Sequence, residues 1–554
     1  MRTLDWWVLG SSLLLIILYG LWKSRGSGSV NQYLLAGKTM PWYAMALSIM
    51  ATQASAITFI STSGQAYVDG MRFVQFYFGL PLAMIIISAT AVPLFHRANV
   101  YTAYEYLERR FDAKTRALVS LIFLIQRGLA VGVALYAPAI VLTVILGWPD
   151  QWTTIIMGTL VVAYTTYGGI KAVTWTDFQQ MLVMFLGLFL SLAMAWRLLP
   201  SDVGLTDALH LAGAAGRLNA VVTSFDWNDR YNLWTGLLGG MFLALAYFGC
   251  DQSQVQRYLT GKSIAQSRLS LLFNAVAKIP MQFFILSVGV LVFVFYTFEK
   301  PPMVFHEVEM ANITRTGEYT GLASRYDAAF ENRRTAARRY LSSRDEASLA
   351  GYRTAQAEFE TTHRAGIRLV EKTSGSGFND TNYIFLSFVM KYLPAGVVGL
   401  ILAAIFAAAM STISAEINSL ATVTVIDVYR RHVRRDASDG HYLAVSRLAT
   451  VFWGVYAVVT AGYGRSLGSL IEAVNMLGSF FYGGLLGVFV LAFAFRRVGG
   501  TAAFVAVLIG EAVIFTLHYS TGIAFLWYNV IGCVVVVCAG LLLSAAGVGR
   551  AVRT

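Results

Sequence analysis

Long apolar stretches separated by short polar segments run along almost the whole sequence. An α-helix rises 1.5 Å per residue, so about 20 apolar residues cross the ~30 Å of hydrocarbon in a bilayer. The pattern therefore predicts an all-α polytopic membrane protein with about 13 transmembrane helices. Their expected ranges are 4–24, 42–66, 72–96, 118–147, 152–169, 174–197, 232–250, 268–298, 396–428, 442–463, 466–496, 500–518 and 523–547.

The composition supports this class. Of the 554 residues, 57% are hydrophobic and 13% are charged, and the mean hydropathy is +0.60, whereas about 25% of the residues in a soluble domain are charged. The formal net charge of +12 fits either a nucleic-acid-binding surface or the basic cytoplasmic loops that membrane proteins carry. In this composition it favours the loops, and we expect no nucleic-acid partner. The three cysteines have neither a disulfide nor a metal-site spacing.

Lysine and arginine are concentrated in alternate short loops, and this asymmetry orients the chain in the membrane. Placing the N-terminus outside assigns the basic loops to the cytoplasm. These loops are 23–38, 109–116, 257–268, 430–435 and 496–497. We therefore expect a multi-pass protein of the plasma (inner) membrane, with its N-terminus outside and its C-terminus in the cytoplasm.

A polar segment, 299–380, interrupts this pattern on the outer side. Its sequence AAFENRRTAARRYLSSRDEASLAGYRTAQAEFETTHRAGIRLVEK is rich in Ala, Arg and Glu, with few Gly or Pro residues, which predicts helices on the surface. The arginines suggest an anionic partner, but acidic residues are as frequent, which favours a solvated helical hairpin. Docking of a periplasmic partner through 299–380 is the alternative use of this insertion.

Several predicted spans carry polar residues, and each such residue is a candidate site because burying polar groups in a membrane is costly. The ninth span contains AAAMSTISAEINS (407–419), the second contains TQASAITFISTSG, and the seventh ends in ALAYFGCDQSQVQRYL. The sixth begins TWTDFQQ, which includes Asp177. A stretch such as TQASAITFISTSG can unwind, because its hydroxyl groups and a bound ion satisfy the freed backbone groups.

The ninth span also has a distinctive face. Positions three and four apart share one side of a helix, so Ala408, Ser411, Thr412 and Ala415 form one stripe of small and hydroxyl residues. Small residues let another backbone approach closely, and hydroxyl and carbonyl oxygens together suit Na⁺ better than a divalent ion. The same hydroxyl groups can instead bond to their own backbone or to a neighbouring helix. The stripe alone leaves both interpretations open.

These motifs together resemble the sodium:solute symporter family. LILAAIFAAAMSTISAEINSLATVTVIDVY is similar to the family's signature helix, and SAITFISTSGQAY, YTTYGGIKAVTWTDFQQ and FGCDQSQVQRYLTGKS match in order. VALYAPAIVL and DQSQVQRYL look most like the branch for monocarboxylates, iodide and multivitamins. The resemblance implies a LeuT-type 5+5 inverted repeat with extra terminal helices. Its parts would be an extra helix at 4–24, a first repeat at 42–197, a second repeat at 232–496 interrupted by 299–380, and extra helices at 500–547.

The resemblance also implies a sodium site between the second and ninth spans. Carried over by position, its ligands are the carbonyl oxygens of Ala51, Ala54 and Ala408 and the hydroxyl oxygens of Ser411 and Thr412. Some family members hold a second Na⁺, for which Asp177 and Ser414 match. Ala415 stands where a further hydroxyl is wanted, so Asp177 has the alternative role of pairing with a cation near the cytoplasmic side.

Substrate contacts are expected at the breaks in the second and seventh spans. The candidates are Gln53, Thr58, Tyr77, Tyr247 and Lys278, with Tyr247 as the aromatic gate beneath the substrate. Thr58 and Tyr77, like Ala244 and Ile471, stand where sugar-transporting relatives have amide or carboxylate groups. A buried Lys278, together with Arg127 and the N-termini of half-helices, favours a small, monocarboxylate-like organic anion. A sugar, sugar acid, vitamin or amino acid remains the alternative.

Other classes of protein fit less well. The chain contains no His-Glu-x-x-His, Gly-x-Ser-x-Gly or Gly-x-x-x-x-Gly-Lys-Ser/Thr motif, so we expect it not to be an enzyme. A membrane sensor built on a transporter core is the other alternative, but we expect no soluble output domain after the last span. The sequence therefore predicts a Na⁺-coupled symporter that works by alternating access.

Overall fold

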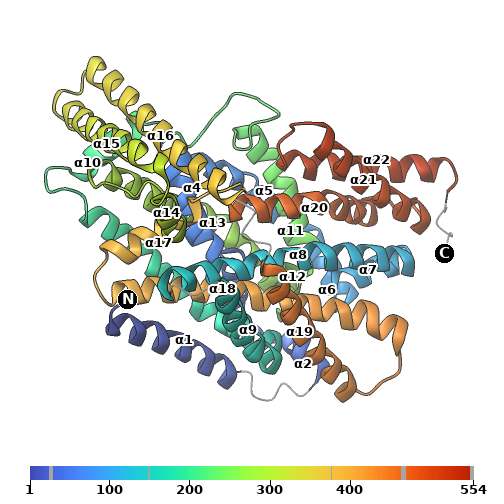
Figure 1. Ribbon diagram of the computed structural model, residues 1–554. Coiled ribbons are helices and arrows are strands. Elements are labelled where there is room, and N and C mark those ends of the chain that lie inside the picture. Colours follow the sequence, from blue (N-terminus) through green and yellow to red (C-terminus); the bar gives the residue numbers. More distant parts are fainter. Residues whose placement is uncertain (24–28, 147–149, 376, 463–468, 549–554) are drawn as a thin grey trace.

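The computed structural model describes residues 1–23, 29–146, 150–375, 377–462 and 469–548. Within these ranges the chain is helical, and its β-structure amounts to one isolated bridge between Met40 and Gly261. Long apolar helices run along a common direction (Figure 1), so that their ends form two opposite faces of the molecule. The N-terminus lies at one face and the C-terminus at the other.

Ten helical segments in the described ranges are long and apolar enough to cross a membrane. They are Thr3–Lys23, Ala56–Ala98, Ala113–Val144, Gln151–Arg197, Ile264–Phe298, Val397–Val433, Asp439–Ala461, Leu470–Ala494, Gly500–Ser520 and Leu526–Ala545. Two of them are 43 and 47 residues long, about twice the length of a single crossing. The chain is thus an all-helical integral membrane protein, as its composition predicts.

The longer of these two segments lies within α9 (Asp150–Arg197), which bends at a single glycine. Gly169 has φ +57° and ψ −166°, a conformation that side-chain-bearing residues rarely adopt. A Cβ at this position would lie 2.6 Å from the carbonyl oxygen of Tyr33. Spans were expected at 152–169 and 174–197 with a short loop between them; one left-handed glycine replaces that loop.

Two helices are interrupted, as the polar and glycine-rich stretches predict. In the first, α3 (Trp42–Gln53) and α4 (Ala56–Asp69) are separated by Ala54 and Ser55. In the second, α11 (Gly240–Gly249) and α12 (Gln252–Leu259) are separated by Cys250 and Asp251. The Asp251 carboxylate caps α12, because its Oδ1 accepts hydrogen bonds from the backbone N–H and the hydroxyl of Ser253.

The most deeply buried of the ten candidate membrane spans contains α18 (Val397–Val423), in which every residue from 401 to 423 is buried. It packs against α8 (Ala113–Leu146), α9 and α1 (Thr3–Lys23). The first helix also caps it: Asp5 Oδ1 accepts hydrogen bonds from the backbone N–H groups of Gly396 (2.7 Å) and Gly399 (3.1 Å). The carboxylate thereby satisfies two N–H groups at the start of α18 that have no partner within the helix.

The remaining elements complete the bundle. The α-helices are α2 (Val30–Leu35), α5 (Leu80–Ala89), α6 (Ala91–Ala98), α7 (Ala103–Arg110), α10 (Leu205–Ala214), α13 (Ile264–Phe298), α14 (Glu307–Ile313), α17 (Thr381–Tyr392), α19 (Asp439–Ala461), α20 (Leu470–Ala494), α21 (Gly500–Ser520) and α22 (Leu526–Ala545). Two short elements are 3₁₀-helices, η1 (Ala36–Lys38) and η2 (Gly70–Tyr77). Two others are π-helices, η3 (Thr235–Gly239) and η4 (Thr424–Val433).

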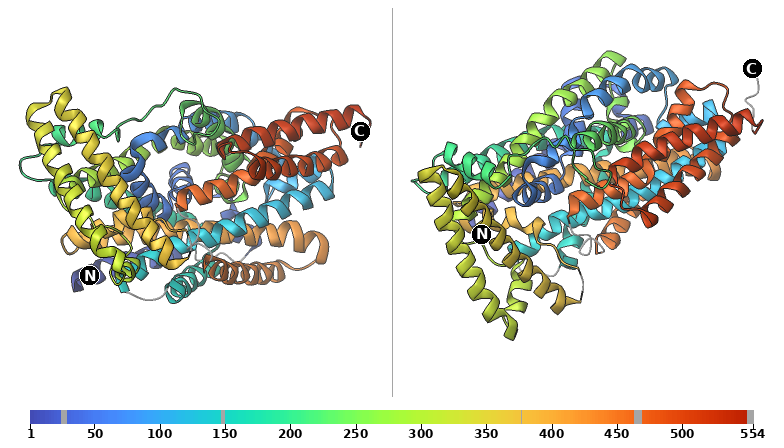
Figure 2. Two further views of the ribbon diagram at one scale, coloured as in Figure 1. Left: turned by 45° about the horizontal axis from the view of Figure 1, so that its top comes forward. Right: turned by 90° about the horizontal axis from the view of Figure 1, so that it is seen from above.

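The polar insertion forms a helical hairpin at one end of the bundle, as its composition predicts. Its helices are α15 (Gly317–Ser343) and α16 (Glu346–Ser374), and they project beyond the ends of the long apolar helices (Figure 2). We call this end of the bundle the insertion end. The other end, where α7, η4 and the C-terminus lie, is the opposite end.

The hairpin is anchored to the bundle by a buried arginine. Arg333 of α15 is 1% exposed, and its guanidinium donates a hydrogen bond to the carbonyl oxygen of Tyr296 in the last turn of α13. The same guanidinium lies 3.6 Å from the centre of the Phe359 ring on α16. One side chain therefore satisfies a C-terminal carbonyl of a long helix and makes a cation–π contact within the hairpin.

Candidate functional site

The two sequence motifs expected to form the sodium site lie side by side. Thr412 of α18 donates a hydrogen bond from its hydroxyl to the carbonyl oxygen of Thr52, 3.0 Å away in the last turn of α3. The neighbouring Ser411 donates its hydroxyl to Asp177 Oδ1 of α9 at 2.7 Å. The helix break in α3/α4 thus faces the hydroxyl stripe of α18, although the two are 360 residues apart.

The expected carbonyl ligands come from the same junction. Ala51 lies in the last turn of α3 and Ala54 in the break, where helical hydrogen bonding lapses. Both are fully buried, as is Ala408, one turn before Thr412 on α18. A cluster of carbonyl and hydroxyl oxygens at a helix break, with few charges, has the donor chemistry that Na⁺ prefers.

Asp177, a candidate for a second Na⁺, has both of its oxygens engaged by protein groups. Oδ1 accepts from Ser411, Oδ2 accepts from the Ser48 hydroxyl at 2.5 Å, and Nη1 of Arg257 lies 3.7 Å from Oδ2. Ser414 donates its hydroxyl to the carbonyl oxygen of Ser411 at 3.0 Å. Asp177 therefore pairs with a cation, which is the alternative role expected for it, and that cation is Arg257 of α12.

Lys278 of α13 is a buried ammonium group without a hydrogen-bond partner in the described part of the chain. The side chain is 0% exposed, and its Nζ lies 5.3 Å from the centre of the Tyr77 ring. Burying a cation without a counter-charge is costly, so this position demands an explanation beyond packing.

Gln53 and Thr58 flank the break between α3 and α4. The Thr58 hydroxyl donates a long hydrogen bond of 3.4 Å to the carbonyl oxygen of Gln53. The side-chain oxygen of Gln53 is buried and has no hydrogen-bond partner among the described residues. The break therefore offers an unused amide acceptor next to the sodium-site backbone.

Tyr247 of α11 lies between charged and aromatic neighbours. Its hydroxyl accepts a hydrogen bond from Gln254 Nε2 of α12 at 2.7 Å, so it spans the break in the seventh expected helix. The Arg127 guanidinium lies 5.4 Å above its ring, and the ring of Tyr482 lies 6.1 Å away. This position, wedged beside the break, is suited to an aromatic gate.

Arg127 was expected to attract an anionic substrate, and the structure contradicts that role. On α8, its Nη1 donates to Glu416 Oε1 at 2.8 Å, while its Nη2 donates to Asp251 Oδ2 and to the Tyr482 hydroxyl at 2.7 Å. Two carboxylates already compensate its charge, so Arg127 has little left with which to attract a substrate. The sequence did carry a signal, because charged residues inside membrane helices almost always pair with one another.

Polar contacts close the bundle over these residues at both ends. At the insertion end, Glu472 of α20 binds Arg230 Nη1 at 2.6 Å and the Tyr231 hydroxyl at 3.1 Å. At the opposite end, the amide of Gln256 on α12 donates to Asn418 (3.1 Å) and to Thr422 (3.1 Å). It also donates to the carbonyl oxygen of Leu34 in α2.

Comparison with known proteins adds a family. A sequence model of the sodium:solute symporter family matches residues 33–316 and 353–510. The unmatched segment 317–352 contains α15 and the turn of the hairpin. A structure titled as the substrate-bound, outward-open state of a Na⁺-coupled sialic acid symporter with a novel Na⁺ site superimposes with a TM-score of 0.78. The two chains are 23% identical, and the match covers 99% of each.

The named relatives include transporters of different substrate classes. The chain is 26% identical to the sodium/sialic acid symporter NanT of Aliivibrio fischeri, over 98% of this chain and 92% of the relative. It is 27% identical to sodium-coupled monocarboxylate transporter 1 of Xenopus laevis, over 92% of this chain and 71% of the relative. These similar identities favour no single branch, but the family match covers most of the sequence. The chain therefore belongs to the sodium:solute symporter family, whose members are secondary transporters and not enzymes.

Proposed function

We propose that this Na⁺-coupled symporter imports a small organic anion of the monocarboxylate class. The observation that carries the proposal is Lys278, whose ammonium is fully buried and lacks a partner in the described chain. A carboxylate beside it would supply the counter-charge. Arg127 is already held by Asp251 and Glu416 and Arg257 is paired with Asp177, whereas the described residues offer Lys278 no counter-charge within hydrogen-bond distance.

The surrounding residues favour a small anion over a sugar. Tyr77 lies against Lys278, and Thr58, Ala244 and Ile471 bring few hydrogen-bonding groups to the two helix breaks. A sugar would leave several hydroxyl groups unpaired in such a site, which costs free energy for each group. A small carboxylate needs one strong partner and an otherwise apolar surface, and Tyr247 would cover it from the side of α12.

For the coupling ion we propose one Na⁺ at the junction of α3 and α18. Its ligands would be the carbonyl oxygens of Ala51, Ala54 and Ala408 and the hydroxyl oxygens of Ser411 and Thr412. The contact between Thr412 and the last turn of α3 supports this assignment. A second Na⁺ at Asp177 and Ser414 is disfavoured, because Arg257 and two hydroxyl groups already engage the Asp177 carboxylate.

The same proposal includes a topology of thirteen crossings. The two long segments 56–98 and 151–197 would each cross twice, and the shorter apolar helix Thr235–Gly249, continued by α12, would add one crossing to the ten. The repeats would be 42–197 and 232–496, each opening with an interrupted helix, with extra helices at 4–24 and 500–547. The insertion end, with 299–380 and the N-terminus, would face outward, and the basic opposite end with the C-terminus would face the cytoplasm.

Uptake into proteoliposomes tests the function. Radiolabelled small monocarboxylates, sugars, sugar acids, vitamins and amino acids are presented with and without an inward Na⁺ gradient. We expect Na⁺-dependent uptake of a small carboxylate that falls to background in Lys278→Met. Uptake of a neutral sugar that survives Lys278→Met would contradict the anion proposal, and uptake indifferent to Na⁺ would contradict the coupling.

A further inference from the structure

The Arg127 cluster joins two parts of the molecule through a single guanidinium. Its two carboxylates are Asp251, between α11 and α12, and Glu416, on α18. All three residues are at least 95% buried, with exposures of 4% for Arg127, 0% for Asp251 and 5% for Glu416. One cation thus faces two anions in the interior of a membrane protein, where one carboxylate would suffice to compensate it.

The two carboxylates are attached to their surroundings in different ways. Asp251 Oδ1 is committed to the N-cap of α12, so its Oδ2 moves with that helix. Glu416 binds Arg127 through Oε1 only, and its Oε2 is buried without a hydrogen-bond partner in the described chain. Arg127 therefore connects α8 to α12 through Asp251, and α8 to α18 through Glu416.

The pair α8–α18 is tied together a second time, near the opposite end. Arg116 at the start of α8 donates to Asp427 Oδ1 at 2.7 Å and to the carbonyl oxygen of Ile426, both in the η4 continuation of α18. Two ion pairs thus join these helices along their length. We treat α8 and α18 as one body, within which the Arg127–Glu416 distance is fixed.

Helix α12, in contrast, is held by side-chain contacts around a break. Asp251 binds Arg127, and Gln252 binds the backbone of Tyr101 and Ala103 at the start of α7. Gln256 binds Asn418 and Thr422 of α18, and Arg257 pairs with Asp177 of α9. Transporters with broken helices open by moving one part of the bundle relative to the other around the site. Opening at the opposite end requires α12 to leave, and Asp251 must then separate from Arg127.

We propose that Glu416 is a positioning residue that keeps Arg127 paired while α12 moves away. In the closed arrangement Arg127 is shared by Asp251 and Glu416; in the open arrangement Glu416 alone compensates it. Without Glu416, departure of Asp251 would leave a buried guanidinium without a counter-ion, and opening would become costly. The second carboxylate, redundant in the closed state, thus has its role in the open one.

Cysteine labelling tests the proposal without any substrate. Thr422 lies beneath α12, 0% exposed, and accepts the Gln256 hydrogen bond, so a cysteine there reacts when α12 moves away. The test protein is the full chain with Cys250, Cys533 and Cys538 replaced by Ser and with Thr422→Cys. A charged maleimide present on both faces of proteoliposomes then reports the opening of the opposite end.

The proposal predicts that two substitutions change the rate of cysteine labelling in opposite directions. Glu416→Gln should slow labelling on the order of tenfold, because opening now isolates Arg127. Asp251→Asn, in which the amide oxygen can still cap α12, should speed labelling severalfold, because α12 leaves without breaking its ion pair to Arg127, while its Arg257–Asp177 pair is the same in both proteins. A merely structural role for the cluster would move both variants in the same direction. Any combination other than slower for Glu416→Gln and faster for Asp251→Asn overturns the proposal.

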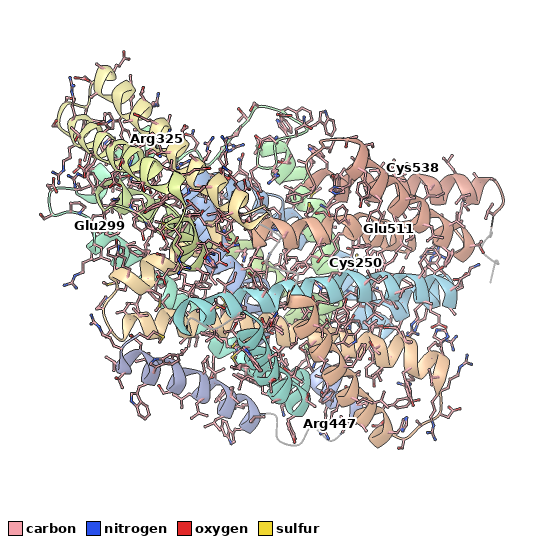
Figure 3. The ribbon with its side chains drawn as sticks, viewed as in Figure 1. Cys250, Glu299, Arg325, Arg447, Glu511 and Cys538 are labelled. Atoms are coloured by element: carbon pink, nitrogen blue, oxygen red, sulfur yellow. The ribbon has the colours of Figure 1, made fainter. Side chains whose placement is uncertain are left out.

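A matched control is available in the same protein. Glu511 of α21 is another carboxylate in a membrane helix, labelled among the C-terminal helices in Figure 3, and both of its oxygens lack partners in the described residues. Glu511→Gln should leave labelling unchanged. If Glu416→Gln does not fold, as judged by size-exclusion chromatography, Asp251→Asn decides alone: unchanged or slower labelling overturns the proposal. The inference rests on alternating access and not on the substrate, so its failure leaves the anion proposal standing.

Discussion

The Thr412 hydroxyl of α18 and the Thr52 carbonyl oxygen of α3 are 3.0 Å apart and share a hydrogen bond. This contact joins the hydroxyl stripe of one helix to the last turn of an interrupted helix. Each of these two oxygen atoms can coordinate a bound cation in place of the hydrogen bond. The contact therefore locates the point at which Na⁺ would connect the two halves of the protein.

Thr412→Val keeps the size and branching of the side chain and removes its oxygen. Because a hydrogen bond or ligand contact to a charged group contributes about 1.5–3 kcal/mol, the Na⁺ concentration for half-maximal uptake should rise on the order of 10-fold to 100-fold. Thr450→Val on α19 is the matched control, since the Thr450 hydroxyl donates to the carbonyl oxygen of Ser446 in its own helix. Equal Na⁺ dependence in the two variants would remove Thr412 from the site.

Lys278→Met should stabilise the protein and abolish its transport. Methionine keeps an unbranched side chain of similar length but carries no charge, so it removes an unpaired ammonium from the interior. The free energy of unfolding should rise by about 1–3 kcal/mol in the absence of substrate, measured as thermal stability in detergent. A loss of stability instead would mean that the ammonium has a structural partner.

The insertion should detach when its buried arginine is removed. Arg333→Ala deletes a cation–π contact and a hydrogen bond to the end of α13, which together contribute about 2–4 kcal/mol. Limited proteolysis should then cut 317–374 faster than in the parent. The neighbouring Arg334 pairs with Glu331 on the exposed face, and Arg334→Ala should change the cutting rate little.

The contact between the hairpin and α17 should weaken as the pH rises. Burial disfavours the charged form of His363, but the Asp380 carboxylate 3.7 Å away, a hydrogen bond to the Met303 backbone and the charge of Glu360 together raise the pKa of His363 above its usual 6.5. A histidine whose pKa is higher in the folded than in the unfolded protein stabilises the fold at pH values below its unfolded-state pKa. This stabilisation is lost as the pH rises through the folded-state pKa. Hydrogen exchange at Phe305, whose N–H donates to Asp380, should therefore accelerate over that range beyond its intrinsic rate.

His363→Gln provides the control for this pH dependence. Glutamine can still donate a hydrogen bond to Asp380 but does not titrate, so the additional acceleration at Phe305 should disappear. If the acceleration persists in His363→Gln, another group is responsible for it.

Local patterns were sufficient to predict much of the architecture. The helix breaks at Ala54 and Asp251 follow from polar and glycine-rich segments within apolar runs, and the stripe of α18 follows from helical spacing. The hairpin follows from a composition with few helix breakers. Each of these features depends on residues close together in sequence.

The pairings of buried charges depend on contacts that no local pattern encodes. Arg127 meets partners 124 and 289 residues away, which reversed its expected role. Arg257 was visible in the motif DQSQVQRYL, but its proximity to Asp177 required the packing of α12 against the other helices. Arg333 was expected on the surface with the other arginines of the hairpin, and only the position of α13 buries it.

The cap that Asp5 places on α18 ties the first helix to the helix that carries the proposed sodium ligands. Counted by repeats, α1 is a peripheral addition, yet its carboxylate fixes the first turn of the helix that carries Ser411 and Thr412. Loss of the Asp5 carboxylate would leave two backbone N–H groups at the start of α18 without this partner, so a change at the N-terminus would act on the first turn of that helix.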